Sequence, residues 1–215
     1  MSSGALMTVQ IENVITSGTF SLDGGTWDVD NNVWVIGDDS EVMVIDPAHD
    51  VAKILEVVGD REVMAVLLTH GHDDHIRAAA EFSDEVEAPL YLNPADSMLW
   101  DAIYPERKVD AEIQEGDTFT IGDTTLTAIH TPGHSPGSTC FYAPDLGVLF
   151  SGDTLFNGGP GATGRSYSSF ETIVESIRTK LLVLPEATVV NTGHGDATTI
   201  GAEAPNLDEW IKRGH

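Results

Sequence analysis

Four side chains that can ligate a metal ion lie within six residues of this sequence: His70, His72, Asp74 and His75. An apolar, strand-like run over 62–69 leads into them, and a helix-like run follows. Residues two positions apart in an extended segment share a face, so His70 and His72 can bind one ion together, whereas Asp74 and His75 fall on the first helical turn. Imidazole and carboxylate ligands favour zinc or iron, and the lack of thiolates argues against a closed structural zinc site.

Three further ligands follow at intervals along the chain. His134, Asp153 and His194 each come after an apolar, β-rich run and within a turn that contains glycine. Side chains that follow strands tend to gather at one edge of a sheet, where α/β proteins often place their chemistry. A polar loop that is rich in histidine by chance is the alternative, but these later partners favour a metal site.

The order of these residues resembles that of the metallo-β-lactamase superfamily. That superfamily carries a His-x-His-x-Asp-His motif followed by His, Asp and His ligands, as the chain does from about Val33 to His194. The resemblance implies an α/β fold, the αββα sandwich of two mixed sheets flanked by helices. It also implies a single domain over residues 1–215, a length that suits one domain with a sizeable core.

The resemblance implies two divalent metal ions, with zinc expected and iron or manganese as alternatives. His70, His72 and His134 would bind the first ion, and Asp74, His75 and His194 the second. Asp153 would bridge the two, because a carboxylate has two oxygens and can span a pair roughly 3.5–4 Å apart. Asp74 is also expected to act in catalysis.

The residue at position 153 separates branches of this superfamily. Its β-lactamases commonly carry cysteine at the matching position, whereas aspartate, within the run 151–156 (Ser-Gly-Asp-Thr-Leu-Phe), resembles glyoxalase II and related thioester hydrolases. The resemblance therefore implies a compact glyoxalase II-like hydrolase that cleaves a small thioester of a low-molecular-weight thiol with a metal-bound hydroxide. Only 21 residues follow His194, so we expect no counterpart of the helical domain with which glyoxalase II helps to bind glutathione, and another low-molecular-weight thiol is an alternative.

Two other functions stay open. A persulfide dioxygenase with one iron would use His70 or His72 with His134 and Asp153, and it would leave Asp74 and His75 idle. A metal-binding scaffold or sensor would need the ligands without catalysis, which seven complementary ligands around an open site do not favour.

The charge of the chain excludes several partners. Its 35 acidic and 10 basic residues give a formal net charge of −25, which repels nucleic acid and anionic membrane surfaces. No run of 18 apolar residues and no signal peptide are found, so we expect a cytoplasmic protein that acts on a small molecule. The charge indicates a well-solvated surface or, alternatively, adaptation to high salt.

Several residues outside the ligand set have a predicted place. Arg165 follows the glycine-rich loop 157–164 and can hold an anionic part of the substrate, or it can pair with a surface acid. Asp46 ends a strand and is expected to orient a histidine, with a solvated turn as the alternative. We expect His130 to pack or to bond outside the ligand set, and His49 and His215 to lie at the surface.

The coarse pattern is strands, helix, strand, helix, repeated once. A loop over 18–30 carries Phe20 and Trp27, which could line a substrate cleft or simply pack. The lone Cys140 is expected in a buried strand. Predicted strands cover 8–15, 31–37, 41–46, 62–69, 89–92, 118–121, 124–129, 138–142, 148–150 and 188–191. Predicted helices begin at Asp50, at Asn93 with Pro94, at Ser168 with Glu171 (reaching about Leu184 before Pro185), and at Asn206 with Glu209.

Overall fold

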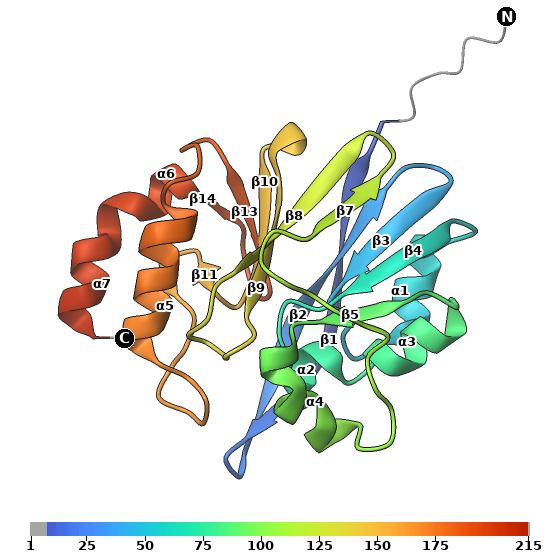
Figure 1. Ribbon diagram of the computed structural model, residues 1–215, viewed down its shortest axis with the longest axis horizontal. Helices are drawn as coiled ribbons and strands as arrows, with labels where there is room; N and C mark the ends of the chain where they lie inside the picture. Colours follow the sequence, from blue (N-terminus) through green and yellow to red (C-terminus); the bar gives the residue numbers. More distant parts are fainter. Residues whose placement is uncertain (1–7, 215) are drawn as a thin grey trace, which may run out of the picture.

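Two six-stranded sheets pack face to face, and helices cover the outer face of each sheet (Figure 1). The computed structural model describes residues 8–214. Both sheets contain parallel and antiparallel pairs, so each is mixed. The predicted αββα sandwich is therefore confirmed.

The first sheet comes from the N-terminal half of the chain. It begins antiparallel and becomes parallel from its third strand onward, where the connections pass through helices. In order across the sheet its strands are β1 (Gln10–Leu22), β2 (Gly25–Gly37), β3 (Glu41–Ile45), β4 (Glu62–Leu67), β5 (Leu90–Leu92) and β6 (Ala111–Glu112).

The second sheet comes from the C-terminal half. Unlike the first sheet, it is paired largely antiparallel, with one parallel pair between β10 and β13. In order they are β14 (Thr198–Thr199), β13 (Val189–Thr192), β10 (Val148–Gly152), β9 (Thr139–Ala143), β8 (Thr124–His130) and β7 (Thr118–Ile121). A small separate hairpin pairs β11 (Leu155–Phe156) with β12 (Gly159–Pro160).

Strand β3 shows why the sheets pack as layers. Its side chains alternate between two faces, so Val42 and Val44 pack under the outer helices while Met43 and Ile45 face the second sheet. Both faces of the strand are apolar because both are covered. Three apolar cores result, one between the sheets and one under each helical layer.

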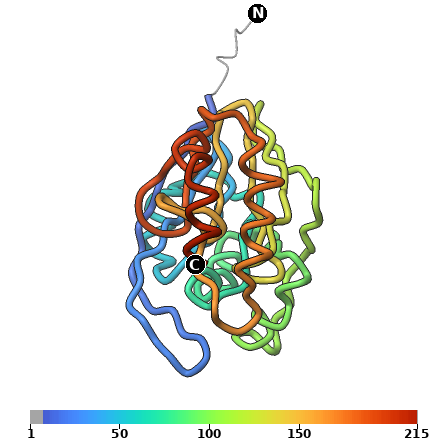
Figure 2. The backbone as a smooth tube through the Cα atoms, turned by 90° about the vertical axis from the view of Figure 1, so that its left-hand side faces the viewer, coloured from blue at the N-terminus to red at the C-terminus, as the bar shows by residue number. Residues whose placement is uncertain are grey.

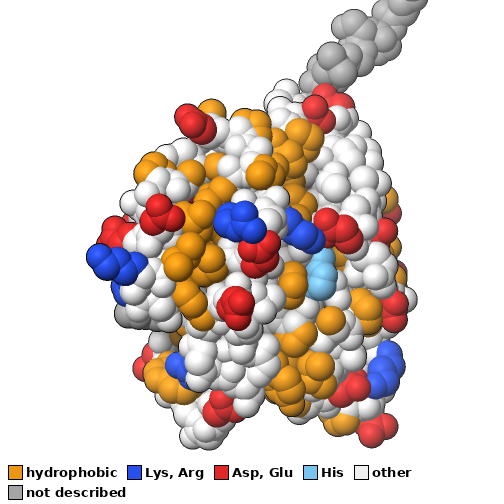
Figure 3. Space-filling model, turned by 60° about the vertical axis from the view of Figure 1, so that its left-hand side comes forward, with side chains coloured by type: hydrophobic (Ala, Val, Ile, Leu, Met, Phe, Trp, Pro, Cys, Tyr) orange, Lys and Arg blue, Asp and Glu red, His pale blue; other side chains and the backbone are white. Residues whose placement is uncertain are grey.

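The helices are short, and each layer belongs to one half of the chain (Figure 1). Among the described residues none of them is long and apolar enough to cross a membrane. The face that carries α5 and α7 shows apolar side chains between acidic and basic ones (Figure 3). The α-helices are α1 (Val51–Val58), α2 (Asp73–Ile76), α3 (Ala79–Glu85), α4 (Ser97–Ile103), α5 (Phe170–Ser176), α6 (Ile200–Glu203) and α7 (Leu207–Arg213). Short 3₁₀ helices are η1 (Pro94–Asp96), η2 (Pro144–Leu146) and η4 (Ala204–Asn206), and η3 (Ile177–Leu181) is a π-helix.

The prediction of a loop over 18–30 was wrong. Strands β1 and β2 run through it as one long antiparallel hairpin that turns at Asp23 and Gly24. Phe20 and Trp27 lie opposite each other in this hairpin, and their rings stack with centroids 5.7 Å apart. Such a cross-strand aromatic pair supports strand pairing where glycine and aspartate favour a turn. Figure 2 shows the hairpin extending past the rest of the chain at one end.

The helix starts predicted at Asp50, Asn93 and Asn206 are confirmed, the one predicted at Ser168 lies one residue later, and the side-chain cap predicted at Asn206 is absent. Asp50 caps α1 through the Lys53 amide, and Asn93 caps η1 through the Ala95 amide. The cap of α5 is Ser169 rather than Ser168, and the helix passes into η3 at Ile177 and ends before Leu184. Asn206 precedes α7 but makes no side-chain cap, because its amide instead donates to the Ala202 carbonyl.

Candidate metal centre

The histidine cluster lies between strand β4 and helix α2, as its sequence predicts. His70 follows the strand in an extended segment, His72 is the cap residue of α2, and Asp74 and His75 lie in the first turn of that helix. All four side chains are buried. The four ligands of this segment can therefore point in two directions, because the backbone changes from extended to helical between His70 and His75.

The later ligands reach the same place from the second sheet. His134 lies between β8 and β9, Asp153 follows β10 and His194 follows β13. These strand ends meet α2 at one edge of the two sheets (Figure 1). The structure thus brings all seven predicted ligand side chains together.

His70, His72 and His134 form the first ligand set. His72 Nδ1 lies 3.1 Å from His70 Nε2 and 3.0 Å from His134 Nε2. The three nitrogens all lie within 4.8 Å of one another, which is close enough for a single metal ion to contact all of them.

Asp74, His75 and His194 form the second ligand set. His75 Nε2 lies 3.2 Å from His194 Nε2 and 3.4 Å from Asp74 Oδ2, and the last two atoms are close to each other as well. Asp153 lies between the two sets: its Oδ1 is 3.3 Å from His75 Nε2, and its Oδ2 is 3.5 Å from His134 Nε2. Its carboxylate therefore faces both sets.

The tautomers of the histidines show that the first set fits a metal ion. Thr69 Oγ1 donates to Asp46, so it accepts its bond from His70 Nδ1–H. His134 Nδ1–H donates to the Ala162 carbonyl. A neutral imidazole carries one N–H, so Nε2 of both rings presents a lone pair toward His72. His72 Nδ1 can donate to only one of these two nitrogens, so at least one lone pair in the set is left for a cation or a proton.

Asp153 gives a second indication that these residues fit a metal ion. Its Oδ1 is buried and has no hydrogen-bond partner among the described residues. Its nearest nitrogen, His75 Nε2, lies 3.3 Å away and makes no hydrogen bond of good geometry, so this oxygen has lost its water without a full replacement, which is costly. A divalent cation between the two sets would satisfy this oxygen, so the donor set fits a metal centre.

The two sets differ in their electrostatics. Burial lowers the pKa of His70 well below 6.5 and that of His72 to about 3, so these rings stay neutral. Burial also opposes charge on His194, but Asp153 and Asp74 raise its pKa to about 10. The carboxylates of Asp74, Asp153 and Asp46 likewise overcome burial and raise the pKa of His75 well above 6.5. The second set thus attracts positive charge, and a proton and a metal cation would compete for it.

Asp46 orients a histidine in each of the two sets, whereas one histidine was expected from the sequence. Its Oδ2 accepts from His75 Nδ1, 2.9 Å away, and from Thr69 Oγ1, which in turn holds His70. Its Oδ1 accepts from the Thr69 amide. Asp46 has a backbone φ of 52°, which is rare outside glycine and concentrates at functional sites. Its oxygens are used by these bonds, so it positions ligands instead of joining them.

The prediction that His49 lies at the surface was wrong. His49 is half-buried, and its Nε2 lies 2.8 Å from Asn31 Oδ1. Asn31 is fully buried and donates from Nδ2 to Asp74 Oδ2 at 3.0 Å. The two residues fix the Asp74 carboxylate from outside the second set. His215 lies outside the described residues, and His130 bonds to the Pro136 carbonyl away from both sets.

A cavity of about 230 Å³ opens onto the ligands. Phe20, Trp27 and Val29 of the β1–β2 hairpin line this cavity together with Arg165. The Arg165 guanidinium lies 3.8 Å from the centroid of the Trp27 ring, and among the described residues it makes no ion pair. Arg165 thus makes no direct ion pair with a surface acid, although hydrogen bonds from Ser166 lower the pKa of Asp23 and the charge of Arg165 adds to that effect.

Larger hollows elsewhere on the molecule lack such a ligand set. A groove of about 840 Å³ lies along α5 and α7, and a pocket of about 350 Å³ lies beside α4. Neither is lined by any of the seven ligands, so we identify the site by its converging ligand atoms and not by the size of the cavity.

Sequence reasoning missed two residues that hold this site, Asn31 and Asp96. Asn31 lies in a strand, and Asp96 ends a 3₁₀ helix. Both are buried polar side chains whose partners are distant in the sequence. The only local signal in the sequence was a polar residue at a position where no turn is predicted.

Comparisons with known proteins agree with this geometry. Residues 26–194 match the metallo-beta-lactamase superfamily. The hydroxyacylglutathione hydrolase GloC of Haemophilus influenzae is 33% identical over 182 residues, which cover 77% of this chain and 85% of GloC. Among solved structures, the B3 metallo-beta-lactamase BLEG-1 is 31% identical with a TM-score of 0.73, covering 88% of this chain and 97% of BLEG-1. TTHA1623 in a di-iron-bound form is 30% identical with a TM-score of 0.71, covering 82% and 93%. The fold, the ligand order and these matches together show that the chain belongs to the metallo-beta-lactamase superfamily.

Proposed function

We propose that this metallo-hydrolase cleaves a small thioester of a low-molecular-weight thiol with two divalent metal ions, zinc being the first to test. The observation that carries the proposal is Asp153, whose carboxylate faces both ligand sets. His70, His72 and His134 would hold one ion, and Asp74, His75 and His194 the other. When bound, such a pair supplies the positive charge that activates water near neutral pH and polarises an acyl carbonyl.

The relatives support the hydrolase but differ in what their names state. GloC is named a hydroxyacylglutathione hydrolase, which acts on a thioester, whereas BLEG-1 is named a metallo-beta-lactamase. Aspartate at position 153 favours the first kind of activity, since cysteine is common there in β-lactamases. The di-iron form of TTHA1623 supports a centre of two ions and leaves iron open as the metal here.

The chain's own side chains would bind and orient the substrate. Phe20, Trp27 and Val29 offer an apolar wall against which part of the substrate can pack and exclude water. Asp74 has a pKa lowered to about 2, because His75 and His194 outweigh the effect of burial. It is therefore ionised at neutral pH, and it accepts hydrogen bonds from water or substrate but donates none.

Arg165 would hold a carboxylate of the substrate. Its guanidinium lies over the Trp27 ring, which helps to position its N–H donors without using them. In a chain with a net charge of −25, this cation is a local exception beside the cavity. Arginine presents paired donors that match a carboxylate, so an anionic acyl or thiol group is the expected partner.

The assembled second set supports hydrolysis over the single-iron alternative. Persulfide dioxygenation with His70 or His72, His134 and Asp153 would leave Asp74 and His75 idle. Instead these two converge with His194, and Asn31 and Asp46 hold them in place.

The experiment measures metal content per chain on protein purified without added metal, and then turnover of a panel of thioesters. We expect two ions per chain at saturating zinc and hydrolysis of at least one anionic thioester. Oxygen-dependent oxidation of a persulfide, without hydrolysis of any thioester, would move the assignment to the dioxygenase.

The role of Arg165 is tested by Arg165→Ala on the best thioester. We expect KM to rise by roughly ten- to a hundredfold with kcat little changed, since a hydrogen bond to a charged group contributes about 1.5–3 kcal/mol. Arg178→Ala is the matched control, because Arg178 is exposed and pairs with Glu175 far from the cavity. An unchanged KM in Arg165→Ala would remove Arg165 from the substrate site.

A further inference from the structure

Asp96 lies between the two loops that carry the first ligand set. It is the last residue of η1, and its side chain is fully buried. No lysine or arginine among residues 8–214 pairs with it. A buried carboxylate without a cation is expensive unless several hydrogen bonds satisfy it, so its partners indicate why it is there.

All of its partners belong to the two ligand loops. Oδ2 accepts from the Gly71 amide at 2.8 Å, between His70 and His72, and from Ser135 Oγ at 2.6 Å, next to His134. Oδ1 accepts from the Gly137 amide at 2.5 Å. One carboxylate therefore joins the loop after β4 to the loop after β8.

The glycines in these loops fit closely around Asp96. A Cβ on Gly71 would lie 3.1 Å from Asp96 Cβ, and a Cβ on Gly137 would lie 2.7 Å from Asp96 Cγ. Side chains at either position would push the carboxylate away from its donors. The absence of side chains there lets both backbones approach the same two oxygens.

We propose that Asp96 is a positioning residue that sets the separation of His70 and His72 from His134, and so the metal affinity of the first ligand set. The inference rests on the metal centre and not on the choice of thioester. The second set is supported by Asn31 and by Asp46, which also reaches His70 through Thr69, and Asp96 contacts neither of these supports. The effect of Asp96 should therefore be confined to one set.

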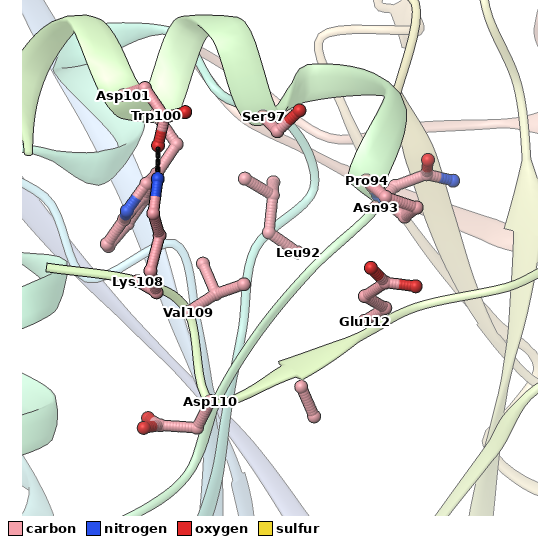
Figure 4. Close-up of a pocket in the computed structure, with 11 residues that line it drawn as sticks. Leu92, Asn93, Pro94, Ser97, Trp100, Asp101, Lys108, Val109, Asp110 and Glu112 are labelled. Atoms are coloured by element: carbon pink, nitrogen blue, oxygen red, sulfur yellow. Dashed lines mark hydrogen bonds and ion pairs between the residues drawn. The ribbon is translucent and has the colours of Figure 1, made fainter. Parts of the chain in front are cut away.

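Helix α4 supplies a matched control on the other side of the same segment. Figure 4 shows the pocket beside α4, where Ser97 and Trp100 line the wall and Asp101 bonds to Lys108. Asp101 is half-exposed, and its carboxylate is 2.7 Å from Lys108 Nζ. Asp101→Asn makes the same change of charge five residues away without touching a ligand loop.

The test compares zinc affinities of the separate sites in the wild type, Asp96→Asn and Asp101→Asn. An asparagine keeps one accepting oxygen but turns an NH₂ group toward a donor, so one of the three bonds is lost. We expect the first site to bind zinc roughly ten- to a hundredfold more weakly in Asp96→Asn, as is typical when a residue that orients ligands is changed. The second site, and both sites of Asp101→Asn, should keep the wild-type affinity.

Cobalt(II) substitution and thermal unfolding separate positioning from folding. Absorption bands of cobalt report ligand geometry, so Asp96→Asn should change the bands of the first site alone. A purely structural role would instead lower the melting temperature of the metal-free protein and leave the affinities and spectra unchanged, which would overturn the proposal. Equal weakening of both sites would overturn it as well.

Ser135→Ala gives a milder variant that removes only one of the three donors. We expect it to weaken the first site by a few-fold, in the same direction as Asp96→Asn. If Asp96→Asn does not fold, Ser135→Ala decides, and unchanged zinc affinity in that variant would contradict the proposal. A wild type that binds no zinc would remove the metal centre itself, which is a different failure.

Discussion

The two ligand sets are built from the same kinds of residue but differ in their surroundings. His70, His72 and His134 are all buried, and the loops that carry them are joined through Asp96. In the second set, the side chain of His194 is 25% exposed, and its Nδ1 is held by the backbone carbonyl of Asp30. Both sets border the cavity, through His72 and His134 in the first and through Asp74 and His194 in the second. We call the first set enclosed because all of its side chains are buried, and the second set open because His194 is partly exposed.

This difference should give the two sets different affinities for a metal ion. In the enclosed set burial keeps His70 and His72 neutral, so protons do not compete for their nitrogens and the set suits an ion that stays bound. The open set combines imidazoles with carboxylate charge and includes the partly exposed His194, so it suits an ion that exchanges more readily. We therefore expect the first ion to bind more tightly than the second.

Removing one nitrogen from the enclosed set should have the largest effect. We expect His134→Ala to lose the first ion and to reduce activity roughly a thousandfold, because a metal contributes several kcal/mol to lowering the barrier. Metal content and kcat/KM are measured on the same sample. His130→Ala is the control, because His130 lies four residues earlier and bonds only to the Pro136 carbonyl and, through its backbone, to neighbours outside both sets. Equal losses in both variants would contradict the assignment.

Removing the carboxylate between the sets should affect them unequally. Asp153→Ala leaves three histidines in the first set but takes charge from the second, whose His75 and His194 both lie 3.3 Å from Asp153 oxygens. We expect zinc content to fall from two ions toward one and activity to fall by roughly a hundredfold or more. Loss of the first ion with retention of the second would reverse our assignment of the two sets.

The ligands were predictable because their signals are local. Each of the seven follows an apolar run, and a strand end is recognisable within a few residues of sequence. The alternation of β3, with valines on one face and Met43 and Ile45 on the other, gives a layered core on the same local grounds. The choice of the αββα sandwich among α/β folds came from the family resemblance and not from the pattern alone.

The residues that hold the ligands were not predictable, because their partners are distant. Asp96 bonds to Gly71 and Gly137, 25 and 41 residues away, and nothing near Asp96 in the sequence indicates either contact. The hairpin over 18–30 was missed for a related reason. Its glycines and aspartates favour a turn locally, whereas the pairing of Phe20 with Trp27 across the strands decides the structure.

The support of Asp74 allows a milder test of the open set. Asn31→Ala removes the amide that donates to Asp74 Oδ2 and leaves every ligand in place. We expect the second zinc affinity to fall by about tenfold, as is typical for a residue that orients a ligand. The first site of the same variant is the internal control, and a matching fall there would show that Asn31 acts on the fold and not on one set. Competition with a chelator measures both affinities.

The smallest effect that we expect is in the count of protons released on metal binding. Near pH 8 the metal-free second set should carry protons, because carboxylates raise the pKa of His194 to about 10 and that of His75 well above 6.5. His70 and His72 of the first set should carry none, since burial lowers their pKa. Calorimetry in buffers of different ionisation enthalpy should therefore show up to two protons released with the second zinc and fewer with the first.

The same charges give the metal-free protein a pH dependence of known sign. A pKa raised in the folded state adds stability that is complete below the unfolded value of about 6.5 and is lost as the pH rises through the folded value. For His194 the loss should run from about pH 6.5 to about pH 10. Saturating zinc replaces these protons, so thermal unfolding of the loaded protein should depend less on pH across that window. A metal-free protein that grows more stable from pH 7 to pH 10 would show that the open set does not hold its charge in this way.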